Sequence, residues 1–126
     1  MMHEKHAKFF VNLLGADNAY FDDAHRIAYC YDATRKRHLP DGVLFPRDER
    51  DVSEILKYCN KNGVKIVPRG AGSGFTGGAL AHEGGVVLAF EKHMNKILTV
   101  SGMIPCLYLM ALIKHLQSSS LLKRML

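Results

Sequence analysis

Residues 69–79 of the chain read RGAGSGFTGGA, and five of the eleven glycines of the sequence occupy the nine positions from 70 to 78. Glycine adopts positive φ freely and has no Cβ, so successive backbone N–H groups can converge on an anion at close range. Ser73 and Thr76 add hydroxyl donors, and Arg69 adds positive charge at the loop entrance. This stretch predicts a loop that holds a pyrophosphate. The structural alternative is a flexible surface loop or hairpin.

Two common phosphate loops are excluded by what surrounds these glycines. A Walker A loop needs Lys followed by Ser or Thr after its last glycine, whereas Gly77 is followed by Gly78 and Ala79. The spacing Gly72-x-Gly74-x-x-Gly77 matches the dinucleotide fingerprint, and Glu91 stands where its ribose-binding acid is expected. However, only residues 79–83 separate Gly78 from Gly84, too few for the helix of a βαβ crossover. A Rossmann unit is therefore excluded.

The residues on either side of the loop predict an α+β unit. Asp48 is placed to cap a helix over residues 48–62, with Val52, Ile55, Leu56 and Cys59 as its core-facing stripe and Gly63 as its left-handed end. We expect β-strands at 64–67, closed by Pro68, at 86–90, and at 43–45. A further helix is predicted over residues 4–14, and residues 16–42 give no regular pattern.

Composition limits the classes of protein to which the chain can belong. The 126 residues are 48% hydrophobic and 23% charged, as in a folded globular domain, and a net charge of +5 without a basic block does not indicate a nucleic-acid partner. Three widely spaced cysteines favour a reducing compartment over a disulfide framework. The sequence predicts neither a secretory signal nor a transmembrane segment, because its longest apolar run has ten residues.

These motifs together resemble a known family. The segment 44–46, the helix 48–62, the run Val67-Pro68 followed by the glycine stretch, and residues 86–97 are similar to the start of a vanillyl-alcohol-oxidase-type FAD-binding domain. Within that superfamily the chain resembles the branch of the FAD-linked D-lactate dehydrogenases and glycolate oxidases. The upstream segments 31–34 and 39–41 also resemble this branch. The resemblance implies an α+β fold in which helices accompany a small parallel or mixed sheet with a glycine-rich loop.

The resemblance also implies a cofactor and its contacts. In the family the glycine loop surrounds the FAD pyrophosphate with main-chain amides, and Pro68 would end the strand that leads into it. The implied cofactor-binding residues are Pro68, Arg69, Gly70, Ala71, Gly72, Ser73, Gly74, Gly77 and Gly78. Some relatives attach flavin through a histidine in this loop, where this chain has Ser73, so we expect non-covalent FAD. No catalytic or metal-binding residue is assigned.

The resemblance fades after about residue 98. We therefore predict a partial FAD-binding domain at 1–98 and a divergent tail at 99–126, produced by a shifted reading frame or forming an extra helix. The family continues with a second half of the domain and a cap that supplies the substrate pocket. From this difference we expect weak or absent FAD binding and no turnover by the isolated chain.

Three functions remain open from the sequence. The first is part of an FAD-dependent oxidoreductase acting on a 2-hydroxy acid such as D-lactate or glycolate. The second is a free-standing nucleotide- or partner-binding module, with another chain supplying the missing half of a flavin site. The third is a membrane-surface protein whose C-terminal segment, residues 103–126, lies in the lipid interface. The expected location is the cytoplasm, with peripheral attachment to the inner membrane as an alternative.

Overall fold

The computed structural model describes residues 3–98. Residues 3–95 belong to one compact unit, which contains all of the described helices and strands. The predicted tail, residues 99–126, lies outside the described residues, as does the proposed interfacial segment within it. The boundary at residue 98 therefore stays a prediction.

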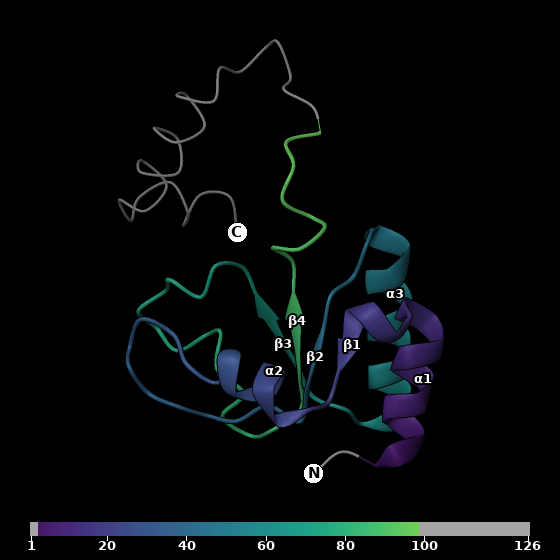
Figure 1. The fold of residues 1–126 in the computed structure, drawn as a ribbon, viewed down its shortest axis with the longest axis horizontal. Coiled ribbons are helices and arrows are strands. Elements are labelled where there is room, and N and C mark those ends of the chain that lie inside the picture. Colours follow the sequence, from purple (N-terminus) through teal and green to yellow (C-terminus); the bar gives the residue numbers. More distant parts are fainter. Residues whose placement is uncertain (1–2, 99–126) are drawn as a thin grey trace, which may run out of the picture. The chain divides into compact units, whose positions relative to one another are not determined.

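The unit is a mixed sheet with helices, which confirms the predicted α+β class (Figure 1). In chain order the elements are α1 (Glu4–Leu14), the 3-10 turn η1 (Ala16–Asn18), β1 (Ala19–Tyr20), α2 (Asp23–Ala28), β2 (Gly42–Leu44), α3 (Glu49–Asn62), β3 (Ile66–Arg69) and β4 (Val86–Ala89).

The strands lie in the order β1-β2-β4-β3. Strands β2 and β3 both pair with β4 in parallel, and β1 pairs with β2 antiparallel. The strand predicted at 64–67 begins and ends later than expected, because β3 runs through Pro68 to Arg69, which pairs with Ala89. Pro68 is accommodated since β3 is the edge strand, where a missing N–H costs no ladder bond.

Strand β4 is buried on both faces, which explains its uninterrupted apolar sequence. Val86 and Leu88 pack with Phe10, Leu14, Ile55 and Cys59 in a core between the sheet and helices α1 and α3. Val87 and Ala89 pack on the other face with Val43, Phe45 and the flanking Tyr29. Figure 1 shows α2 on this second face, opposite α1 and α3.

Helix α3 confirms the predicted capping at both ends. The Asp48 side chain accepts hydrogen bonds from the backbone N–H groups of Arg50 and Asp51, and Gly63 ends the helix at φ 66°. Ile55 and Cys59 are buried as expected, but Leu56 is 48% exposed, so its predicted place in the core is wrong. Leu56 lies one position beyond the buried stripe, where the helix surface turns away from the sheet.

Candidate functional site

The glycine loop connects the two strands β3 and β4, which are parallel neighbours. The connection spans residues 70–85, and the described chain forms no helix there. This confirms that the loop is not part of a βαβ crossover. The loop begins at the carboxyl end of β3, and in parallel sheets ligands bind beside the carboxyl ends of the strands.

The loop presents an unusual number of free backbone donors. Among the described residues, no backbone N–H group from Gly70 to Ala79 donates a hydrogen bond within the chain. The exposed positions in this stretch are Gly70, Ala71, Ser73, Gly74, Phe75, Thr76 and Gly78. Such a series of N–H groups without an acceptor in the described part of the chain, together with the exposed residues Ser73 and Thr76, has the chemistry that a pyrophosphate requires.

The five glycines of the loop serve two different purposes. Gly72 and Gly77 have φ of 69° and 77°, and a Cβ on them would lie 2.2 Å from Nη2 of Arg69 and 3.2 Å from Nε2 of His82. Glycine at these two positions is required by the shape of the loop itself.

At Gly70 and Gly74, neither the backbone angle nor a neighbouring atom requires glycine. Their φ angles are ordinary, and a Cβ on either would meet nothing within 4 Å. Gly78 is similar, with only an ordinary 3.7 Å contact to Thr76. Internal packing therefore does not explain glycine at these positions, whereas the close approach of a ligand to the backbone does. The loop fits a pyrophosphate on this count as well.

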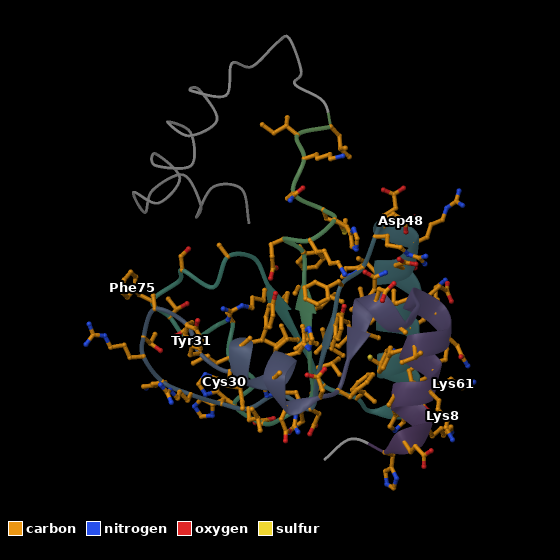
Figure 2. All side chains as sticks on the ribbon, in the orientation of Figure 1. Lys8, Cys30, Tyr31, Asp48, Lys61 and Phe75 are labelled. Atoms are coloured by element: carbon orange, nitrogen blue, oxygen red, sulfur yellow. The ribbon has the colours of Figure 1, made fainter. Side chains whose placement is uncertain are left out.

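Arg69 lies beneath the loop and does not project from its entrance. The residue is only 7% exposed, and Nη1 donates to the carbonyl oxygen of Tyr31 at 2.7 Å. Its Cζ atom is 5.3 Å from the centre of the Tyr29 ring. Figure 2 shows Tyr31 and the loop residue Phe75 on the side of the sheet opposite Lys8 and Lys61.

Two further groups beside Arg69 carry chemistry that sequence reasoning did not assign. The Tyr29 hydroxyl donates to Oε1 of Glu91 at 2.5 Å. Burial, followed by this hydrogen bond to Glu91, raises the pKa of Tyr29 to about 12. Tyr29 is therefore a neutral hydrogen-bond donor at physiological pH.

Asp32 is the second group, and it is 5% exposed. Its Oδ1 atom accepts from the backbone N–H of Thr34 at 2.8 Å and from the Thr34 hydroxyl at 2.5 Å. The hydroxyl bond is the main cause that holds the pKa of Asp32 below its usual value, and the nearby charge of Arg69 acts in the same direction. Oδ2 of Asp32 and Oε2 of Glu91 are buried without a partner among the described residues.

The predicted site residues lie at the end of β3 (Pro68 and Arg69) and in the loop that follows it (Gly70 to Gly78). Pro68 is exposed in β3, and the next residue, Arg69, is buried at the end of the same strand. The resemblance had already singled out the segment that contains Asp32, and the dinucleotide comparison had singled out Glu91. The structure places Asp32 within electrostatic range of Arg69 and joins Glu91 to Tyr29, over whose ring the Arg69 guanidinium group lies.

Other kinds of site receive no support within residues 3–98. No group of three His, Cys, Asp or Glu side chains in this range could hold a metal ion. None of the helices in the same range has the length and hydropathy needed to cross a bilayer.

Comparisons with known proteins identify the family of the chain. The sequence profile of the FAD binding domain family matches residues 40–104, which is just over half of the chain. Glycolate oxidase subunit GlcD of Bacillus subtilis is 43% identical over 91 residues, which cover 71% of this chain and 19% of the relative. The mitochondrial D-lactate dehydrogenase (cytochrome) of Arabidopsis thaliana is 49% identical over 51 residues, 40% of this chain and 9% of the relative.

A solved structure gives the same result for the fold. The crystal structure of p-cresol methylhydroxylase with substrate bound superposes with a TM-score of 0.66 at 25% identity. The match covers 77% of this chain and 20% of that protein. The chain thus spans about a fifth of the length of these two longer matches.

Proposed function

Because the chain belongs to the FAD binding domain family, we propose that the loop from Gly70 to Gly78 binds the pyrophosphate of FAD. The observation that supports this most directly is the run of backbone N–H groups without an acceptor among the described residues, on a loop where neither φ nor packing requires glycine at Gly70 and Gly74. The residues proposed to contact the phosphates are Gly70, Ala71, Gly72, Ser73, Gly74, Gly77 and Gly78.

Pro68 and Arg69 have supporting roles in this proposal. Pro68 precedes the loop on the edge strand, where it restricts the backbone, and Arg69 lies beneath the loop. Ser73 occupies the position at which some family members carry a flavin-linked histidine. FAD would therefore be held by non-covalent contacts alone.

We further propose that the chain forms part of an FAD-dependent oxidoreductase that acts on a 2-hydroxy acid. This rests on the names of its relatives, glycolate oxidase and D-lactate dehydrogenase. Bound FAD would supply the two-electron redox chemistry, while the present residues would bind and orient the cofactor through its phosphates. No described residue is assigned a catalytic role.

The flavin ring and the substrate need walls beyond the described residues. The chain covers 19% of the glycolate oxidase relative, so we propose that further polypeptide, in the same chain or in a partner chain, completes the site. FAD binding by the 126 residues alone is then expected to be weak. Cys30 and Cys59 are free and buried thiols, which supports a reducing, cytoplasmic location.

The test is to titrate the chain with FAD and with ADP, beside the variants Gly70→Ala and Gly74→Ala. Alanine at these open positions should leave the fold intact or stabilise it slightly, since it restricts the unfolded chain. The added methyl groups should nevertheless weaken binding, because they occupy the space that the phosphates would approach. Ala16→Val, at an exposed position outside the loop, is the matched control. Equal binding by the wild type and both glycine variants would contradict the proposal.

A further inference from the structure

We infer that Arg69 is a positioning residue, which shapes the glycine loop from beneath and does not itself contact the pyrophosphate. The inference rests on the proposed function of the loop. Arg69 is the one charged residue of the stretch 69–79, and the inference gives it a role other than phosphate ligand. The contact between Arg69 and Gly72 is the first observation that supports it.

The guanidinium group fills the place that a side chain on Gly72 would take. A Cβ on Gly72 would lie 2.2 Å from Nη2, 2.4 Å from Cζ and 2.9 Å from Nη1 of Arg69. The backbone at Gly72 thus rests directly on the guanidinium group. With φ at 69°, this residue makes a left-handed turn, and the N–H groups that follow it up to Ala79 donate to no acceptor within residues 3–98.

Arg69 is itself fixed in place from two sides. Nη1 donates to the carbonyl oxygen of Tyr31, 38 positions earlier in the chain, and the group lies over the Tyr29 ring. The flat guanidinium group makes both contacts while it lies against Gly72, and the ammonium group of lysine does not have this shape. The side chain therefore links three separate segments: the turn after α2, the end of β3, and the loop.

The charge of Arg69 is directed into the protein. The buried carboxylate of Asp32 interacts with it, and the Tyr29 ring beneath it is hydrogen-bonded to Glu91. With Asp32 as a partner for its charge and with 7% exposure, the guanidinium group has little surface left for a ligand. Backbone N–H groups, arranged by Arg69, remain as the anion-binding surface.

Arg69→Lys and Arg69→Met in the full chain separate the two roles. Lysine is a competent phosphate ligand, so a contact role predicts that Arg69→Lys keeps pyrophosphate affinity within roughly twofold, while Arg69→Met loses it. A positioning role predicts that both variants lose roughly tenfold, since neither reproduces the planar fork. Affinity would be measured by following backbone amide NMR signals during titration with inorganic pyrophosphate.

The same spectra give a readout that overall stability does not produce. Without ligand, the amide signals of residues 70–78 should move in both variants, while those of Ile55 and Cys59, in the core on the other face of the sheet, stay in place. In the wild type, saturation with pyrophosphate should shift the loop amides strongly and the Arg69 Nε–Hε signal very little. A large shift of the Arg69 signal, or an unchanged loop in free Arg69→Lys, would overturn the inference.

A double-mutant cycle tests the geometry without any ligand. Gly72→Ala should be strongly destabilising in the wild type, because its methyl group meets the guanidinium group, and much less so in the Arg69→Met background. Additive effects would overturn the inference. A wild type that binds no pyrophosphate would overturn the proposed function of the loop, but the cycle would still show whether Arg69 shapes it.

Discussion

Asp41 and Gly85 are joined by two hydrogen bonds that connect the start of β2 to the start of β4. The Asp41 backbone N–H donates to the Gly85 carbonyl oxygen at 2.7 Å, and the Gly85 N–H donates to Oδ2 of Asp41 at 2.9 Å. Gly85 has φ of 93°, and a Cβ on it would lie 2.4 Å from the carbonyl oxygen of Lys65. This pair thus fixes the end of the long connection that begins with the glycine loop.

Asp41→Ala should lower the free energy of unfolding by about 1–3 kcal/mol, because it leaves the buried Gly85 N–H without its acceptor. Asp41→Asn retains a carbonyl oxygen at the same place and should cost clearly less. Urea denaturation of the two variants measures the difference. Equal stability of Asp41→Ala and the wild type would show that the carboxylate does not hold β4.

Asp51 should account for part of the acid sensitivity of the fold. Its carboxylate is 6% exposed and accepts three hydrogen bonds from Arg47, and the side-chain bonds are the main cause that lowers its pKa. A lowered pKa means that the carboxylate stabilises the fold fully above the ordinary value for Asp, about 3.9. This stabilisation is lost as the pH falls through the lowered pKa.

Asp51→Asn should therefore cost about 2 kcal/mol at pH 7, and the difference from the wild type should shrink as the pH falls below about 4. Thermal or urea unfolding between pH 7 and pH 2.5 measures it. Asp23→Asn is the control, because Asp23 forms an exposed ion pair with Arg26 and should change stability little at any pH. A pH-independent effect at Asp51 would contradict the assignment.

The sequence predicted those elements whose signals are local. Helix α3 was recognised from Asp48, its apolar stripe and Gly63, and β4 from a short apolar run. The six-residue helix α2 was not predicted, because it has no buried residue and thus no apolar period to detect. Strand β1 has two residues, Ala19 and Tyr20, and is defined only by its pairing with β2.

The orientation of Arg69 could not be predicted for a related reason. The expected strand ended before Pro68, which placed Arg69 in the loop. In the structure β3 extends to Arg69, so its side chain points to the same face as that of Val67, two residues earlier. The correct end of this strand depends on pairing with Ala89, a contact made 20 positions away.

Cys59 should be chemically inert while the protein is folded. It lies on the core-facing side of α3, and burial raises the pKa of its thiol to about 11. At pH 8 the thiolate, which is the reactive form, is then rare. Iodoacetamide should modify the Cys59 peptide only in urea, as read by mass spectrometry. Rapid labelling in native buffer would contradict its place in the core.

The pKa of Tyr29 should be well above that of an ordinary tyrosine, and Glu91 should contribute to this increase. Its pKa of about 12 rests first on burial and then on the hydrogen bond to Glu91. In Glu91→Gln the charge disappears but an acceptor oxygen remains, so the pKa should fall while staying above 10, the ordinary value. Ultraviolet absorbance of phenolate, taken as the difference between each protein and its Tyr29→Phe counterpart, isolates this one group.

The upward shift of the Tyr29 pKa also determines how the stability of the fold depends on pH. A pKa raised in the folded state means that Tyr29 stabilises the fold fully below pH 10, and that this contribution is lost as the pH rises through about 12. Tyr29→Phe should therefore lose less stability than the wild type between these two pH values, as measured by urea denaturation. Parallel losses in the two proteins, or a Tyr29 pKa near 10, would place the hydroxyl in water and separate it from Glu91.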